Sequence, residues 1–169
     1  GAASGPAFRE GPSHGTSKNE KLPQQEVSGY LGQGLVNTFD PDGDGPTGTL
    51  VSPEFKIDKK FMHLLVGGGD DPITTRVELQ VEGKRVATAT GKQEETLEWT
   101  TWDLTPHQGR TAKVQIVDNA SGPWGHINAD YFMLSDAPLN ELLTDGKPKD
   151  NDPRVVVLGD FEGKTYAPW

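Results

Sequence analysis

The chain has 169 residues, 33% of them hydrophobic, with 21 glycines and 13 prolines, a balance that favours one domain of short strands and many turns. The formal net charge of -9 argues against a nucleic-acid partner, because phosphate binding needs a basic surface. The absence of cysteine excludes disulfides and cysteine nucleophiles, and no run approaches the ~18 apolar residues of a membrane span.

The predicted elements are short strands. Residues 1–26 are polar, rich in Gly, Pro and Ser and without periodicity, so by themselves they predict loops or a linker. Beyond them, alternating or continuous apolar runs predict strands over residues 35–39, 49–57, 61–66, 76–82, 85–90, 97–104, 112–118 and 126–134. Short strands separated by turn signals are typical of an all-β, antiparallel sandwich.

The C-terminal part has a different texture. Residues 1–136 form the predicted body of the module, and residues 137–153 have the composition of a linker that opens with a possible helical turn. Residues 154–169 then begin with the apolar run RVVVL. An isolated apolar strand is an aggregation-prone edge, so we expect this segment to join a sheet.

One acidic loop resembles part of a calcium-binding loop. Asp40, Asp42, Asp44 and Gly45 match the first half of an EF-hand loop, but Val51 stands where the bidentate Glu is needed. The flanking residues also predict strands rather than helices. A hairpin turn is therefore the expected structure, with a partly hydrated calcium site as the alternative.

A second stretch suggests ligand binding. Trp124 stands between glycines and close to His126, so an aromatic face and an imidazole could together hold a sugar. The same residues also fit a structural role, with Trp124 capping the core and His126 bonded to a loop carbonyl. No GxSxG, HExxH or P-loop pattern is present, and we expect no catalytic activity.

Several short motifs then occur in a distinctive order. They are Gly29-Tyr30-Leu31-Gly32, Gly34-Leu35-Val36-Asn37-Thr38-Phe39, Thr47-Gly48-Thr49-Leu50, Ser52-Pro53-Glu54-Phe55, Gly67-Gly68-Gly69, Val81-Glu82-Gly83-Lys84, Thr88-Ala89-Thr90-Gly91 and Trp124-Gly125-His126-Ile127-Asn128-Ala129-Asp130. Together, over roughly residues 27–136, they resemble the family 66 carbohydrate-binding modules attached to bacterial levanases and other family 32 glycoside hydrolases.

The resemblance implies a non-catalytic jelly-roll sandwich from a secreted or cell-surface multidomain protein, with a polysaccharide or glycan as partner. The best-known members recognise the terminal fructose of fructans. By this resemblance Trp124 would stack on the sugar, while His126 and the loop at Asp70 and Asp71 would form hydrogen bonds. The loop departs from the family's Asn-His-Pro-Gly-Glu-Thr, and Ala87 replaces the usual Arg, a loss for which Arg76 or Arg85 is a candidate substitute.

The resemblance also bears on the tail and on a cofactor. Modules of this kind open with a strand like Asp160-Phe161-Glu162-Gly163, which here stands at the C-terminus as a displaced first strand. That strand would fold back, exchange with a neighbouring chain or module, or begin a next tandem module, and exchange would make the chain a structural or adhesive repeat. Related modules hold a structural Ca²⁺, for which Asp130 and Glu162 are the matching ligands.

Overall fold

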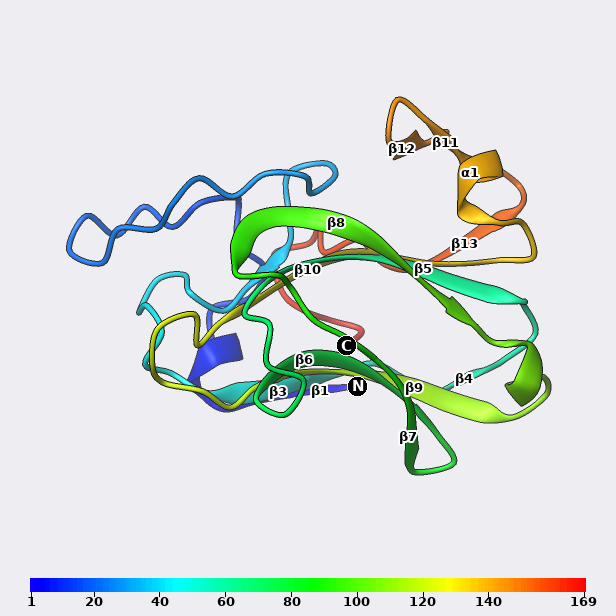
Figure 1. The fold of residues 1–169 in the computed structure, drawn as a ribbon, viewed down its shortest axis with the longest axis horizontal. Coiled ribbons are helices and arrows are strands. Elements are labelled where there is room, and N and C mark those ends of the chain that lie inside the picture. The colour runs from blue at the N-terminus through cyan, green and yellow to red at the C-terminus, as the bar shows by residue number, and fades with distance from the viewer.

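Two antiparallel β-sheets face each other in the computed structural model, which describes residues 1–169 (Figure 1). The first sheet has the order β1-β3-β9-β6-β7, with β4 also paired to β9, and the second has the order β13-β10-β5-β8, with β2 also paired to β10. The predicted all-β class and antiparallel jelly-roll sandwich are therefore confirmed.

The elements are short, as the turn-rich composition predicts. The first sheet contains β1 (Ala2–Ser4), β3 (Gly48–Val51), β4 (Phe55–Lys56), β6 (Thr75–Val81), β7 (Lys84–Ala89) and β9 (Thr111–Asp118). The second contains β2 (Val36–Asn37), β5 (Phe61–Gly68), β8 (Glu94–Asp103), β10 (Ile127–Ser135) and β13 (Val155–Gly159). The remaining elements are β11 (Leu143–Thr144), β12 (Lys147–Pro148), α1 (Leu139–Leu142), and the 3-10 turns η1 (Pro6–Phe8) and η2 (Thr105–His107).

The alternating sequences place one face of each strand in the core between the sheets. Val77 and Leu79 of β6 and Val114 and Ile116 of β9 are fully buried there, and the two strands pair in register. In β5, by contrast, consecutive residues from Met62 are buried, because the outer face of the second sheet is covered as well. This explains why β5 reads as a continuous apolar run rather than an alternation.

The N-terminal residues take part in the sandwich, although their composition predicts loops. β1 pairs with β3, and Phe8 of η1 enters the main core with only 2% exposure. Ser13 and Leu35 exchange two backbone hydrogen bonds further along. These pairings join residues far apart in sequence, so no local periodicity announces them.

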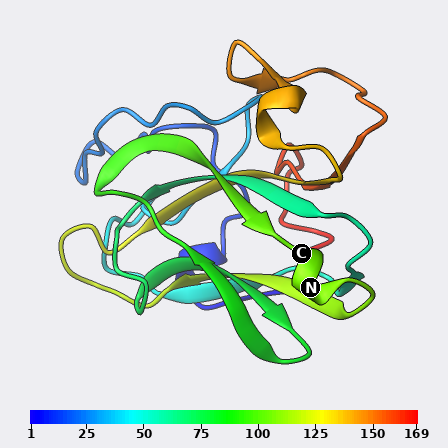
Figure 2. The ribbon, with the colours of Figure 1, turned by 45° about the vertical axis from the view of Figure 1, so that its right-hand side comes forward.

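The C-terminal segment lies on the same chain's sandwich. β13 pairs antiparallel with β10 at the edge of the second sheet, and the aromatic rings of Phe161, Tyr166 and Trp169 belong to the main core. The segment before it is packed as well, because Leu142 of α1 is 1% exposed. The chain ends meet: a β-carbon built on Gly1 would lie 2.5 Å from the carbonyl carbon of Trp169 (Figure 2).

None of the helices is both long enough and apolar enough to span a membrane.

The loop between β9 and β10 carries Trp124, and it lies at the end of the sandwich where the chain leaves β9 (Figure 1).

Candidate functional site

Trp124 is held in a tight turn between β9 and β10. The N–H of Gly125 donates to the carbonyl of Gly122 at 2.8 Å, and Trp124 has a φ of 59°. That left-handed conformation is costly for a bulky residue and persists only where the surroundings fix it. The indole is stacked on the imidazole of His126, with ring centroids 5.5 Å apart and planes inclined by 23°. The turn therefore presents Trp124 in one defined orientation.

His126 is the centre of a buried charged network. Its Nδ1 donates to Asp44 Oδ1 at 2.7 Å, and its Nε2 donates to Glu95 Oε1 at 2.8 Å. Both ring nitrogens can donate at once only when the ring is protonated, so two carboxylate partners stabilise the imidazolium form. Burial lowers the pKa of His126, but the hydrogen bonds and charges of Glu95 and Asp44 outweigh it, and the net pKa is raised. The ring of Phe39 also packs against the imidazole in a T-shaped arrangement, with ring centroids 5.1 Å apart.

Glu95 ties this network to the N-terminal loop. Its Oε2 accepts hydrogen bonds from Asn128 Nδ2 at 2.7 Å and from Gln24 Nε2 at 3.1 Å. Gln24 in turn bonds to the side chain of Asn37. Sequence reasoning missed Glu95 and Gln24. The available signal was the phase of β8, since Glu95 shares the buried face of that strand with Leu97.

A cavity of about 240 Å³ opens beside the Trp124–His126 stack. Its walls are Pro23, Gln24, Gln25, Phe39, Asp44, Glu95, Pro123, Trp124 and His126. The cavity thus combines an aromatic face, a carboxylate and side-chain amides. An aromatic face packs against the C–H groups of a ligand, and carboxylates and amides form hydrogen bonds with its O–H groups. Asp44 is the more accessible carboxylate, with 26% side-chain exposure against 6% for Glu95.

The hydrogen bond of His126 with a sugar stays a prediction, since both ring nitrogens have other partners in this structure. Both of its nitrogens are already committed to carboxylates, and its side chain is 3% exposed. In the structure His126 binds Asp44 through a hydrogen bond and stacks against the ring of Trp124. The hydrogen-bonding groups available to a ligand are therefore Asp44 and the amides of Gln24 and Gln25.

The other predicted sugar contacts lie elsewhere. Asp70 accepts a hydrogen bond from Gln93 at 3.1 Å, and Asp71 accepts one from the N–H of Ile73 at 2.8 Å, which caps its own loop. Arg76 forms an ion pair with Glu78 at 2.5 Å and lines a separate cavity with Thr49 and Asn119. None of the three predicted residues lines the Trp124 cavity, so the structure does not bring them together with Trp124 and His126.

The predicted calcium ligands are occupied by backbone donors. Asp130 is fully buried and accepts from the N–H groups of Leu31 at 2.8 Å and Tyr131 at 2.7 Å. Glu162 accepts from the N–H groups of Gln33 and Gly34, both at 2.9 Å. Burial raises the pKa of Asp130 to about 8, with the charge of Glu162 adding to the shift.

The structure contains no group of three or more His, Asp or Glu side chains that could hold a metal ion. Calcium takes 6–8 oxygen ligands, so the two predicted carboxylates would supply only part of a site that backbone carbonyls and waters would complete. In the acidic loop, Asp42 pairs with Arg9 at 2.5 Å and Asp44 with His126, so Asp40, Asp42 and Asp44 do not converge either. Calcium stays a prediction from the family resemblance.

No family model matches the chain, so membership of family 66 stays a prediction. A protein of Aspergillus rugulosus named "Putative glycosyl hydrolase ecdE" is 45% identical over 112 residues, which is 66% of this chain and 16% of that protein. The chain thus spans about a sixth of the length of the curated relative that it matches.

Three solved structures show lower similarity. The C-terminal extracellular domain of Mycobacterium tuberculosis EmbC has a TM-score of 0.45 and 12% identity, over 74% of this chain and 52% of that chain. A family 35 carbohydrate-binding module from an environmental isolate has a TM-score of 0.33 and 12% identity, over 82% and 100%. The CBM51 from Clostridium perfringens GH95, in complex with methyl-galactose, has a TM-score of 0.33 and 10% identity, over 76% and 84%. These scores are low, so the functional argument rests on the residues of this chain.

Proposed function

We propose that the chain is a non-catalytic carbohydrate-binding module and that the Trp124 cavity receives the sugar. The observation that carries the proposal is the Trp124–His126 stack, which fixes an indole ring beside a partly exposed carboxylate, that of Asp44. Preorganised aromatic and polar groups bind with little loss of conformational entropy. The likeness to a relative named as a glycosyl hydrolase supports a role alongside an enzyme that acts on glycans.

The size of the cavity supports recognition of a terminal sugar. Its volume of about 240 Å³ lies below the roughly 300–1,000 Å³ of pockets that enclose drug-sized ligands. One sugar ring at the end of a polysaccharide suits this volume better than a long internal segment. A terminal sugar of a fructan or of another glycan is the proposed ligand, and the proposed location of the parent protein is the cell surface or the medium.

The arrangement of carboxylates supports binding rather than hydrolysis. Glycosidases of the common type need two carboxyl groups on either side of the scissile bond. Asp44 and Glu95 instead bind the two nitrogens of one imidazole, and the second oxygen of Glu95 accepts from Asn128 and Gln24. Neither acid of this pair is free to donate a proton to a leaving group.

A glycan array tests the proposal. The wild-type chain should bind a subset of glycans that share a terminal sugar, and Trp124→Ala should abolish that binding while Ile73→Ala, which removes an exposed apolar side chain outside the cavity, should not. Circular dichroism establishes that each variant is folded. Binding that survives Trp124→Ala would contradict the proposed site, and release of reducing sugar from a bound polysaccharide would contradict the non-catalytic assignment.

A structural or adhesive repeat is the second candidate, and β13 favours it. This strand lies at the edge of the second sheet, and its Val156 and Val157 are 50% and 42% exposed. An exposed apolar edge strand is a template for pairing with another chain. Concentration-dependent assembly that is lost when Val156 and Val157 are replaced by lysine, together with no glycan binding, would favour this candidate over the first.

A further inference from the structure

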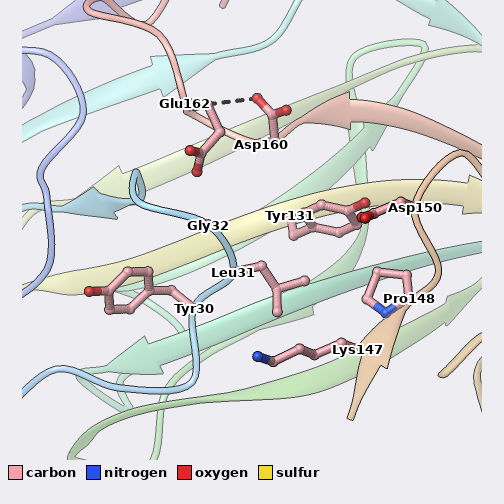
Figure 3. A pocket seen from close by; sticks show the side chains of 9 residues that line it. All are labelled: Tyr30, Leu31, Gly32, Tyr131, Lys147, Pro148, Asp150, Asp160 and Glu162. Carbon is pink, nitrogen blue, oxygen red and sulfur yellow. Dashed lines mark hydrogen bonds between the residues drawn. The ribbon is translucent and has the colours of Figure 1, made fainter. Parts of the chain in front are cut away.

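A second, larger cavity lies over the outer face of the second sheet. Its volume is about 450 Å³, and its walls come from the loop before β2, from β10, from β12 and the residues after it, and from the C-terminal segment. Figure 3 shows the nine residues that line it, which are Tyr30, Leu31, Gly32, Tyr131, Lys147, Pro148, Asp150, Asp160 and Glu162. None of them lines the Trp124 cavity.

The aromatic walls of this cavity are fixed by the fold. Tyr131 stands where β10 changes register against β5, and its φ of 49° turns it away from the regular strand path. Its ring meets Trp99 edge-on, with centroids 6.2 Å apart. Trp99 Nε1 also donates to the carbonyl of Gly146 at 3.1 Å, which ties the β11–β12 turn to the sheet. The cavity is therefore formed before any ligand arrives.

The walls carry an unequal charge, because three carboxylates face one ammonium group. Glu162 is bonded to the backbone of residues 33 and 34, and Asp160 Oδ1 accepts from the N–H of Glu162 at 3.3 Å. Asp150 has no hydrogen-bond partner, and Lys147 has no ion-pair partner. In Figure 3, Asp160 and Glu162 lie together along one wall, while Lys147 lies on the opposite side.

The walls of this cavity therefore carry a dominant negative charge, with Asp150, Asp160 and Glu162 against Lys147. Such surroundings attract a cation and repel an anion.

We propose that this cavity binds an amino sugar that carries a free ammonium group, such as a glucosamine residue of a de-N-acetylated polysaccharide. Asp150 and Asp160 would accept from the ammonium group, Tyr30 and Tyr131 would pack against the sugar ring, and Lys147 would donate to a ring hydroxyl. A uronic acid is disfavoured by the charge, and an N-acetylated sugar lacks the ammonium group. The inference does not depend on the Trp124 cavity.

Calorimetry with a matched pair of disaccharides tests this inference. The probes are the β-1,4-linked disaccharide of glucosamine and its doubly N-acetylated form, at one ionic strength. We expect the glucosamine disaccharide to bind at least tenfold more tightly than its acetylated form. Equal affinity for the two, or no binding of the glucosamine disaccharide, would overturn the proposal.

Variants locate the binding. The double variant Asp150→Asn, Asp160→Asn keeps the shape of both side chains and the hydrogen bond at Asp160, and it should lower the affinity for the glucosamine disaccharide at least tenfold. The double variant Asp58→Asn, Asp145→Asn, which removes two exposed carboxylates that do not line the cavity, is the charge-matched control and should change it less than twofold. Trp124→Ala should also leave it unchanged. Retained affinity in the double variant would overturn the proposal.

A simple amine separates the charge from the sugar ring. Butylamine presents the ammonium group without a polyhydroxylated ring, and it should bind at least tenfold more weakly than the glucosamine disaccharide. Equal affinity would overturn the assignment of a sugar, because a lysine side chain would then serve as well. Tyr30→Ala should weaken binding of the disaccharide and leave the weak binding of butylamine unchanged.

Discussion

The indole ring of Trp169 lies against the ring of Phe132, with centroids 4.9 Å apart. The last residue of the chain is therefore part of the core, next to the strand at the centre of the second sheet. The indole N–H also donates to the carbonyl of Leu158 at 3.1 Å, which fixes the segment after β13 against the strand itself.

Replacing this ring should be costly. Trp169→Ala removes a buried aromatic side chain, and such changes lower the free energy of unfolding by about 3–5 kcal/mol. Chemical unfolding in urea measures the loss. Lys164→Ala, an exposed position in the same segment, is the control and should change the free energy of unfolding by less than about 0.5 kcal/mol. Equal stability of the two variants would show that the tail does not contribute to the core.

The meeting of the chain ends predicts a tolerated circular permutation. A chain that begins at Asp150, joins Trp169 to Gly1 through a short Gly-rich linker and ends at Lys149 should keep the β-sheet circular dichroism spectrum and the oligomeric state of the original chain. Both new ends lie in an exposed segment, where new termini are best tolerated. A permutant that folds only as a dimer would instead favour strand exchange between chains.

Stability should fall as the pH rises through the neutral range. Burial raises the pKa of Asp118 to about 7 and that of Asp130 to about 8, and the pKa of His126 is raised by its two carboxylate partners against the effect of burial. In each case the folded chain binds a proton more tightly than the unfolded chain. For Asp118 and Asp130, this stabilisation is fully present below a pH of about 3.9, the pKa of Asp in the unfolded chain. It is lost as the pH rises to about 7 for Asp118 and about 8 for Asp130. For His126, it is present below about 6.5 and is lost above the raised pKa.

The measurement is the free energy of unfolding from pH 5 to pH 9. Asp118→Asn should reduce the slope between pH 5 and pH 7, because Asp118 Oδ2 has no hydrogen-bond partner and a neutral amide fits the same space. A stability that rises over this range, or a slope that the variant leaves unchanged, would contradict the assignment.

Removal of metal should have little effect. The oxygens of Asp130 and Glu162 already accept backbone N–H groups, so we expect the same Tm in EDTA and in millimolar CaCl₂. Glu162→Gln should lower the Tm in both solutions, since an amide oxygen is a weaker acceptor than a carboxylate. A Tm that rises with Ca²⁺ in the wild type and not in Glu162→Gln would show that the carboxylates rearrange into a calcium site.

Local periodicity is what made most of the fold predictable. The alternation of Val77, Leu79 and Val81 defines the buried face of β6, and that of Ala112, Val114 and Ile116 defines the buried face of β9. β1 could not be found in this way. Its three residues are exposed, and it is a strand only because of its pairing with β3, some fifty positions away.

The candidate site likewise combines residues that lie close in the sequence with residues that only the fold brings together. Trp124 and His126 are two positions apart, and sequence alone placed them together. Glu95 and Asp44 reach His126 from 31 and 82 positions away, and only the folding of β8 and of the loop before β3 brings them there. Arg76 was predicted at the site, but it forms its ion pair with Glu78 and lines a cavity that Trp124 does not reach.

The central claim, that a glycan binds beside Trp124, is tested most directly by the indole N–H signals in an NMR titration. The chain has four tryptophans, and the signal of Trp124 is assigned by its loss in Trp124→Phe. On addition of a glycan that binds on the array, the Trp124 signal should shift with saturation, while those of the buried Trp102 and Trp169 stay in place. A bound glycan that leaves the Trp124 signal unchanged, or the absence of any glycan that binds, would contradict the account.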